Sequence, residues 1–289
     1  MLTASPADRI LGPMAPRSTG KRHVWPLRLA LHWLLHSSAR VAAAVATAAE
    51  YAAAGCCRLD ELQRAVQREW GQHEEFTSER HIESGLFPWE EDVYRRVLRP
   101  GDRVLIVGCG SGRDLLTLLQ RGWDAAGLDV APECTAIARH ALESRGLKAE
   151  LYTGPVESVT LPTSFDVIVF SWFCYCYIPQ ASRRLAALCR VAEWLRPGGR
   201  VFISYIPSDP SHRRWMIRLA EATARLTRSD WRPEPGDVII GAPTGRYFAH
   251  YQHQFREDEI EREARAAGLR VVCHERNTEA ILVLAHKEA

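Results

Sequence analysis

The sequence contains no Cys-x-x-Cys pair and no apolar run long enough to cross a membrane. Its eight cysteines are spread over 289 residues, which excludes a small disulfide-stapled domain and gives no signal for a zinc ribbon or a thioredoxin-type redox site. Most of these thiols are expected to be reduced and buried. The most apolar early stretch, residues 27–57, is interrupted by His32, His36, Arg40 and Glu50, so it falls short of the roughly 20 apolar residues that span a bilayer.

The sequence also lacks an excess of charge of either sign. The 37 Lys and Arg residues nearly balance the 35 Asp and Glu residues, and the net charge is +2. This balance argues against a dedicated nucleic-acid-binding protein and favours a small-molecule ligand. The first forty residues are locally basic, which suits either a solvated tail or an arm that touches a phosphate or an acidic partner. No secretory signal is recognised at the start of the chain, so we expect a cytoplasmic protein.

Three regions can be distinguished along the chain. Residues 1–24 are polar, contain several prolines, and are predicted to form a flexible tail. Residues 25–89 carry helical periodicity over 26–57 and 59–75, and are predicted to form an N-terminal helical cap. Residues 90–289 alternate strand-like and helix-like segments, with an insertion expected at about 207–245.

The alternation after residue 90 is typical of a parallel sheet covered by helices on both faces. Strands are expected at residues 103–107, 125–130, 149–153, 165–170 and 200–205, with helices between them at 113–121, 132–145 and 180–195. In the insertion and beyond it, we expect a helix at 211–228, an extended segment at 245–255 and a helix at 256–267. The last two strands, 270–276 and 280–286, flank a short polar turn and are predicted to form an antiparallel hairpin.

A glycine-rich turn is expected between the first strand and its helix. Residues 108–112 have the pattern Gly-x-Gly-x-Gly, which lets a ligand approach the backbone amides at a helix N-terminus. The third glycine of the dinucleotide pattern is missing, because residue 113 is arginine. Asp129 follows at the end of the second strand, where a carboxylate can accept the hydroxyls of a ribose. Alternatively, Asp129 only caps the next helix.

Four segments together resemble the successive motifs of class I S-adenosylmethionine-dependent methyltransferases: residues 103–114, 127–130, 164–171 and 195–201. They occur in the family's order and spacing, and the resemblance covers about residues 90 to 289. It implies a Rossmann-like, doubly wound seven-stranded sheet and S-adenosylmethionine as the cofactor. By this resemblance, the glycine turn lines the methionine end, Asp129 holds the ribose, and residues 154–157 contact the adenine.

The resemblance assigns the following cofactor-binding residues: Gly108, Cys109, Gly110, Gly112, Asp129, Val130, Val156, Glu157, Ser171 and Trp172. Two positions depart from the family's pattern. Ile106 and Pro155 stand where the family often has an acidic residue. The first departure weakens an indirect anchor of the methionine part, and the second concerns the adenine contacts.

An aromatic and thiol-rich segment follows the fourth strand. Residues 171–179 contain four aromatic side chains and two cysteines, and aromatic faces favour a nearby sulfonium cation. Trp172, Phe173 and Tyr177 are therefore predicted to line the substrate pocket, unless they pack beneath the cap. Cys174 and Cys176 suggest an arsenite site as an alternative to ordinary packing, although no third thiolate is identifiable.

A second cluster of polar and aromatic residues lies ahead of the last helix. His250, Tyr251 and His253 are candidate catalytic residues, since an imidazole can act as general base near neutral pH. If the segment is a strand, Tyr251 and His253 share one face and His250 lies on the other. The two histidines should then not bind one metal, and no metal site is predicted. The alternative is that they are ordinary structural histidines.

The expected activity is transfer of a methyl group from S-adenosylmethionine to an O, N or S atom of a small-molecule acceptor. The acceptor is expected between the cap and the insertion. Three alternatives stay open: a non-catalytic module that binds S-adenosylmethionine, a thiol or arsenite methyltransferase, and, disfavoured by the glycine pattern, a nicotinamide oxidoreductase. Residues 88–90 are similar to thiopurine and thiol methyltransferases. The sequence predicts neither the acceptor nor the oligomeric state.

Overall fold

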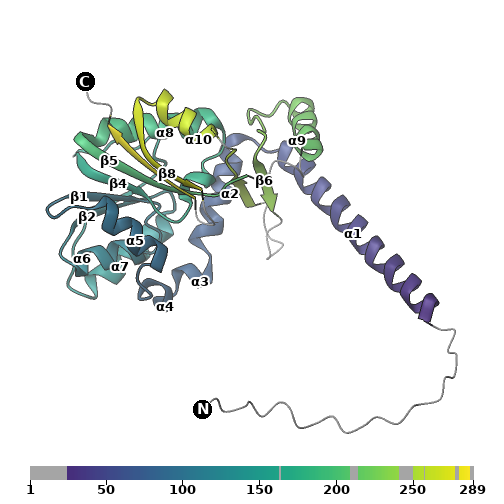
Figure 1. The fold of residues 1–289 in the computed structure, drawn as a ribbon, viewed down its shortest axis with the longest axis horizontal. Coiled ribbons are helices and arrows are strands. Elements are labelled where there is room, and N and C mark those ends of the chain that lie inside the picture. The colour runs from purple at the N-terminus through teal and green to yellow at the C-terminus, as the bar shows by residue number, and fades with distance from the viewer. Residues whose placement is uncertain are drawn as a thin grey trace, which may run out of the picture. The chain divides into compact units, whose positions relative to one another are not determined.

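The computed structural model describes residues 25–162, 164–208, 214–240, 250–256, 258–276 and 280–286. The predicted tail at 1–24 and the predicted turn at 277–279 lie outside these residues, as does the first part of the extended segment expected at 245–255. The chain divides into two compact units, one ending at Val45 and one beginning at Ala46. Helix α1 (Trp25–Gly55) contains the boundary between them (Figure 1). None of the described helices is long and apolar enough to span a bilayer.

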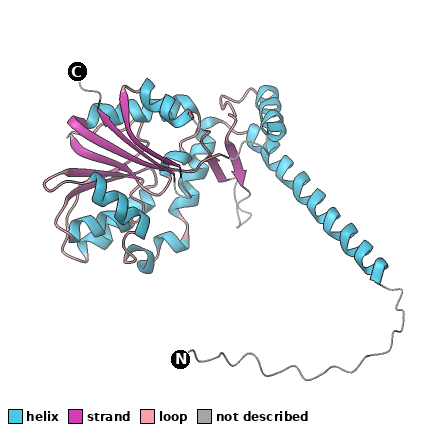
Figure 2. Ribbon diagram, viewed as in Figure 1, coloured by secondary structure: helices cyan, strands magenta, loops and turns pink. Residues whose placement is uncertain are grey.

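The core of the second unit is a seven-stranded sheet with the order β3-β2-β1-β4-β5-β9-β8 (Figure 2). Its strands are β1 (Arg103–Val107), β2 (Asp124–Asp129), β3 (Leu151–Thr153), β4 (Phe165–Phe170), β5 (Leu195–Tyr205), β8 (Leu269–Arg276) and β9 (Ala280–His286). Strands β1 to β5 pair in parallel, whereas β9 is antiparallel to both β5 and β8. The predicted doubly wound sheet with a C-terminal antiparallel hairpin is therefore confirmed.

The strand sequence explains why helices cover both faces of the sheet. Along β1, Val104 and Ile106 belong to one buried cluster and Leu105 and Val107 to the other, as the two-residue period of a strand requires. One face packs against α5 (Pro88–Val97), α6 (Arg113–Gln120) and α7 (Pro132–Glu143). The other face packs against α8 (Ala181–Trp194) and α10 (Glu259–Ala266).

The strand order reverses between β1 and β4, because the chain builds β2 and β3 on one side of β1 and then crosses to the other. In open parallel sheets, ligands bind in the crevice outside the carboxyl ends of the strands at such a point. The fold therefore places the ends of β1, β2 and β4 around one site.

Three stretches differ from the prediction. Strand β5 begins at Leu195, five residues before the expected start, because Leu195 pairs with Phe165 before a register shift leads to the pairing of Arg200 with Val167. Helix α5 and strand β6 (Asp237–Ile240) were not expected. Strand β6 pairs antiparallel with β7 (His250–His253) in a second, two-stranded sheet.

The cap and the insertion share a hydrophobic cluster of their own. The cap continues from α1 into α2 (Leu59–Gly71), α3 (Glu74–Thr77) and α4 (Glu79–Ile82), and the insertion contains α9 (Arg214–Thr227). Tyr51 of α1 and Leu62 of α2 pack in this cluster with Trp231 and Tyr251, all fully or nearly fully buried. The insertion thus supports the cap from outside the main sheet.

A buried arginine ties the insertion to the sheet-covering helices. Arg184 of α8 is fully buried, and its Nη2 lies 3.0 Å from Glu234 Oε2 and 2.8 Å from Glu263 Oε1. Glu259 Oε1 lies 3.7 Å from the same nitrogen. Removing one partner from such a buried ionic network leaves uncompensated charge in a low-dielectric environment.

We predict that Arg184→Met lowers the free energy of unfolding by about 3–5 kcal/mol, because the partly buried carboxylates of Glu234 and Glu263 lose their fully buried cation. The matched control is Arg190→Met on the same helix, since Arg190 forms an exposed ion pair with Glu193 worth about 0.5 kcal/mol. Urea unfolding curves measure both changes. Equal losses in the two variants would contradict a structural role for the network.

Candidate functional site

The turn after β1 is shaped by glycines that no other residue replaces without strain. Gly108, Gly110 and Gly112 have φ angles of +71°, +54° and +98°, a region that side chains with a Cβ rarely adopt. A Cβ at Gly108 would lie 2.5 Å from the Cβ of Cys174. The amides of Gly108 and Cys109 donate to the carbonyl of Leu128 at 2.8 and 3.2 Å, which fixes the turn against β2.

The carboxylate of Asp129 holds the same turn from the end of β2. Its Oδ2 accepts from the Gly110 amide and its Oδ1 from the Ala131 amide, both at 2.8 Å. Burial raises the pKa of Asp129, and the hydrogen bonds from these amides oppose that shift. A carboxylate offers about four acceptor positions, so two remain for hydroxyl groups of a ligand. The residue at the N-cap of α7 is Ala131, so Asp129 does not occupy the capping position.

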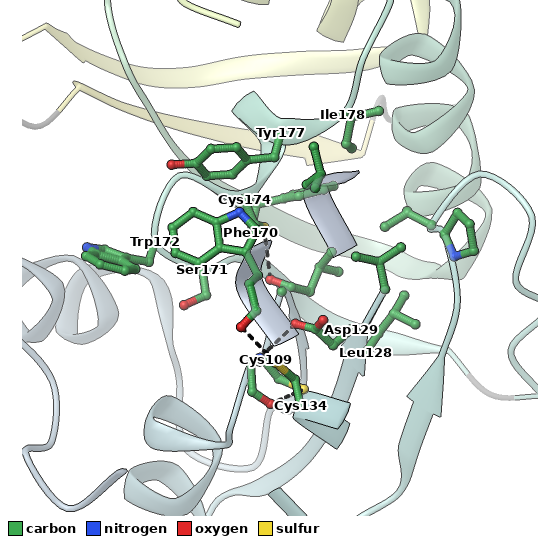
Figure 3. A pocket seen from close by; sticks show the side chains of 18 of the residues that line it. Cys109, Leu128, Asp129, Cys134, Phe170, Ser171, Trp172, Cys174, Tyr177 and Ile178 are labelled. Atoms are coloured by element: carbon green, nitrogen blue, oxygen red, sulfur yellow. Dashed lines mark hydrogen bonds between the residues drawn. The ribbon is translucent and has the colours of Figure 1, made fainter. Parts of the chain in front are cut away.

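These elements surround an open pocket of about 1160 Å³, a volume that includes its solvent-open part (Figure 3). The predicted cofactor residues that line it are Gly108, Cys109, Gly110, Asp129, Val130, Val156, Glu157, Ser171 and Trp172. Gly112 does not line it. A Cβ at Gly112 would lie 3.1 Å from that of Ala138, so this glycine permits close packing of α6 against α7.

A cluster of buried charged and polar side chains forms part of the pocket wall next to the glycine turn. Arg113 and Asp114 line the pocket, and Asp114 Oδ2 accepts from Ser171 Oγ at 2.6 Å and from Tyr94 Oη at 3.0 Å. Arg113 pairs with Asp114 and Glu90. Its Nη1 is buried without a hydrogen-bond partner among the described residues. Burial, followed by the charge of Asp114, raises the pKa of Glu90.

The sequence signal for this cluster was the charged pair Arg113 and Asp114 directly after the glycine turn. The helix that begins there packs against the sheet, so charged side chains in its first turn become buried beside the pocket. From the sequence, Arg113 stood out only as part of the motif at residues 103–114 and as the residue in place of the third glycine. The orphan Nη1 is a cationic donor without a protein acceptor, as a site for a ligand carboxylate requires.

Aromatic rings from the cap and from the segment after β4 close the opposite side of the pocket. We call Trp70, Phe76, Trp172 and Tyr177 the aromatic wall; all four line the pocket. The ring centroids of Trp70 and Tyr177 are 4.9 Å apart, and those of Phe76 and Trp172 are 4.5 Å apart. Figure 3 shows Trp172 and Tyr177 around the same space as Asp129 and Cys174. The predicted placement of Trp172 and Tyr177 at the pocket thus agrees with the structure.

Three hydrogen bonds attach the cap to the cofactor-side loops. Gln67 Nε2 donates to the Val130 carbonyl at 3.1 Å, and Cys134 Sγ donates to the Trp70 carbonyl at 3.6 Å. Ser111 Oγ donates to the carbonyl of Phe76. The cap is therefore fixed directly to the loops that follow β1 and β2.

Phe173 does not line the pocket, contrary to the prediction for the aromatic segment. Trp172 and Phe173 both have positive φ angles, 39° and 62°, so the chain turns sharply and directs the next ring elsewhere. The Phe173 ring stacks on Trp89 at a centroid distance of 5.9 Å, and its amide donates to Ser204 Oγ at 2.9 Å.

The two cysteines of the Cys-x-Cys segment have different surroundings. Cys174 lines the pocket, whereas Cys176 is fully buried and its Sγ accepts from the Ile206 amide at 3.3 Å. Burial raises the pKa of Cys174 and raises that of Cys176 to about 12, which disfavours thiolates. Within the described residues, no three thiols lie close enough to bind one ion. The geometry does not support an arsenite site.

Two of the predicted catalytic residues of β7, Tyr251 and His253, do not line the pocket. His253 is fully buried, with Nδ1 2.7 Å from Asp237 Oδ1 and Nε2 3.2 Å from Glu259 Oε1. Burial lowers the pKa of His253, but the bonds to Asp237 and Glu259 outweigh burial and raise it. Tyr251 Oη donates to the same Asp237 oxygen at 2.7 Å, so Tyr251 and His253 share a face as predicted.

The side chain of His250 lies outside the described residues. Neither Tyr251 nor His253 borders the pocket, and this geometry gives no support for a role as general base. The described groups that come closest to a metal-binding set are Glu234, Asp237 and His253. Their hydrogen bonds to each other and to Arg184 account for them without an ion.

One histidine that the sequence analysis did not select does line the pocket. His81 of α4 lies beside the aromatic wall, with its ring centroid 5.2 Å from that of Phe76 and 6.4 Å from that of Trp172. Burial lowers its pKa, and the charge of Arg113 lowers it further. Its ring makes no hydrogen bond to any residue that the structure describes. The sequence offered no signal for it, because only tertiary packing brings α4 to the pocket.

Comparisons with known proteins find similar methyltransferases. Residues 104–199 match the family model described as a methyltransferase domain. The ubiquinone biosynthesis O-methyltransferase of Bordetella avium is 28% identical over 73% of this chain and 79% of its own length. That of Xanthomonas campestris is 34% identical, but the match spans only 46% of this chain and 55% of the relative. A methyltransferase structure from Methanosarcina mazei, 21% identical, superposes with a TM-score of 0.54 over 70% of this chain and 98% of its own.

Residues 104–199 form a methyltransferase domain of the class I, S-adenosylmethionine-dependent type. Its cofactor, S-adenosylmethionine, supplies an activated methyl group on a sulfonium. The pocket of this methyltransferase fits that molecule on the chemistry of its donors and acceptors. Asp129 has free acceptor positions for ribose hydroxyls, Arg113 has a free donor for the methionine carboxylate, and aromatic faces favour the sulfonium charge. Glu157 and Val156, which the resemblance predicts to contact the adenine, also line the pocket.

We predict that Asp129→Ala weakens binding of S-adenosylhomocysteine by about 1.5–3 kcal/mol, because charge-assisted hydrogen bonds to the ribose are lost. The control is Asp124→Ala at the other end of β2, where the side chain is 70% exposed and far along the strand from the pocket. Isothermal titration calorimetry measures both affinities. An unchanged affinity of Asp129→Ala would mean that the carboxylate does not contact the cofactor.

Proposed function

We propose that this methyltransferase transfers the methyl group to the hydroxyl oxygen of a small, planar aromatic acceptor. The observation that carries the proposal is the presence of a histidine of lowered pKa, His81, beside the aromatic wall of the cofactor pocket. A hydroxyl acceptor needs a base as it becomes the nucleophile, whereas a thiolate or a neutral amine does not. The relatives from Bordetella avium and Xanthomonas campestris are named O-methyltransferases, which supports an oxygen acceptor.

The aromatic wall supports a planar acceptor. Trp70, Phe76, Trp172 and Tyr177 enclose the cap side of the pocket with ring faces and edges, which bind a flat apolar molecule by stacking and exclude water from the methyl transfer. The alignment of acceptor and donor in this dry space is the main contribution expected of the protein. The described part of the insertion contributes no residue to the pocket lining, so the cap and the segment after β4 are together proposed to select the acceptor.

His81 is proposed to take the acceptor proton. A lowered pKa keeps its imidazole neutral near pH 7, so a ring nitrogen is available to accept the hydroxyl proton as the oxygen attacks the methyl carbon. The attack displaces the sulfur in line, and the oxygen keeps the methyl group while His81 keeps the proton. After product release, the proton passes to solvent.

The eight cysteines are all unpaired thiols, as in a reducing compartment. We therefore propose a cytoplasmic location. The near balance of charges supports the expectation that nucleic acid is not the acceptor.

The proposed function is tested by incubating the enzyme with labelled S-adenosylmethionine and three matched panels of small aromatic phenols, anilines and thiols. We expect label in the methyl ethers of phenols. Label confined to anilines or thiols would contradict an oxygen acceptor, and binding of the donor without transfer to any panel would favour a non-catalytic module.

We predict that His81→Gln lowers kcat by a factor of about 10² or more, as expected for loss of a general base, and leaves the affinity for S-adenosylhomocysteine unchanged. In the unmodified enzyme, kcat should rise with pH as His81 loses its proton and level off above a pKa that lies below 6.5. The variant should lose this rise. The control His140→Gln changes a histidine of α7 that does not line the pocket. Identical pH profiles for His81→Gln and the unmodified enzyme would exclude the role.

A further inference from the structure

Helix α1 carries large apolar side chains that the protein leaves exposed over its first five turns. Leu27, Leu31, Leu34, Val41 and Val45 are between 54% and 73% exposed. Their spacing of three, four or seven residues places them along one side of the helix. We call these five residues the apolar stripe. Soluble proteins rarely expose such a continuous apolar surface without a partner.

A basic stripe runs along the opposite side of the same helix, beside the exposed side chains of Leu29 and Trp33. Arg28, His32, His36 and Arg40 follow one another at intervals of four residues and form a second stripe, in which the rings of His32 and His36 stack at a centroid distance of 6.0 Å. The helix therefore exposes many apolar side chains together with one basic stripe, a combination that suits a helix in a membrane interface.

Ser38 is the single polar side chain that interrupts the apolar stripe. Its Oγ donates to the Leu34 carbonyl at 2.8 Å, so the hydroxyl proton is satisfied within the helix. An apolar environment therefore does not leave this donor unpaired.

Charge selects the kind of partner. From Arg9 to Ala49 the sequence contains six Arg or Lys residues and no Asp or Glu. A second copy of residues 25–45 would bring no carboxylate to Arg28 or Arg40. The headgroups of anionic phospholipids would, and each Arg or Lys near such a surface contributes about 1 kcal/mol.

We propose that residues 25–45 form an interfacial helix that binds the protein to an anionic lipid surface. The apolar stripe enters the boundary between headgroups and acyl chains, and the arginines extend along the surface to the lipid phosphates. The helix lies on the bilayer and does not cross it, in agreement with its insufficient length of apolar sequence. This proposal does not depend on the identity of the methyl acceptor.

The test is co-sedimentation of the full-length protein with vesicles of phosphatidylcholine alone or with about one-third phosphatidylglycerol. We expect binding to the anionic vesicles that weakens with salt, and little binding to phosphatidylcholine alone. Leu27→Ser, Leu31→Ser and Leu34→Ser together should reduce the affinity by about tenfold or more, since each loses buried apolar area. The matched control, Ala39→Ser, Ala42→Ser and Ala46→Ser, changes the same helix off the apolar stripe and should bind as the unmodified protein does.

A second pair of measurements separates charge from apolar contact and from self-association. Arg28→Gln with Arg40→Gln should reduce affinity for the anionic vesicles by about tenfold and remove much of the salt dependence. The affinity for S-adenosylhomocysteine should be the same in all variants, which shows that the methyltransferase unit is intact. The proposal is overturned if anionic vesicles do not bind the protein, if leucine and alanine variants bind equally, or if light scattering shows a dimer that the leucine variant dissociates.

Discussion

The whole pocket depends on the way in which one carboxylate and one carbonyl at the end of β2 hold the turn after β1. Asp129 accepts the amide of Gly110, while the Leu128 carbonyl accepts those of Gly108 and Cys109. The turn can take this course only because its glycines adopt positive φ angles. As a result, the amide-rich turn and the acidic strand end face the same space at the point where the sheet order reverses.

The two sides of this space have different origins. The cofactor side comes from loops that directly follow strands β1, β2 and β4, so the sheet itself positions them. The acceptor side comes from the cap, whose Trp70, Phe76 and His81 reach the pocket through packing and through hydrogen bonds from Gln67, Ser111 and Cys134. A common core can therefore keep its donor while a variable cover changes the acceptor. The interfacial helix at the start of α1 belongs to the unit that ends at Val45 and adds a separate contact with lipid.

Whether a feature could be predicted from the sequence depended on whether local sequence or long-range packing produces it. The sheet, the glycine turn and the role of Asp129 at the pocket were predictable, because strand periodicity and short motifs encode them locally. The prediction for Phe173 was wrong because the positive φ angles of Trp172 and Phe173 turn the chain sharply, so that the Phe173 ring points away from the pocket. His253 was a candidate catalytic residue because it is a polar residue ahead of the last helix. In the structure it is buried and hydrogen-bonded to Asp237 and Glu259. His81 could not be found because no local pattern reports which helix will cover a pocket.

The most direct test of this account is a crystal structure of the protein with S-adenosylhomocysteine bound. We expect the ribose hydroxyls on the Asp129 carboxylate, the amino acid carboxylate near Arg113, and the sulfur facing the aromatic wall with His81 beyond it. A ligand whose ribose contacts other groups, or whose sulfur points away from Trp172 and His81, would contradict both the assignment of the pocket and the proposed acceptor side.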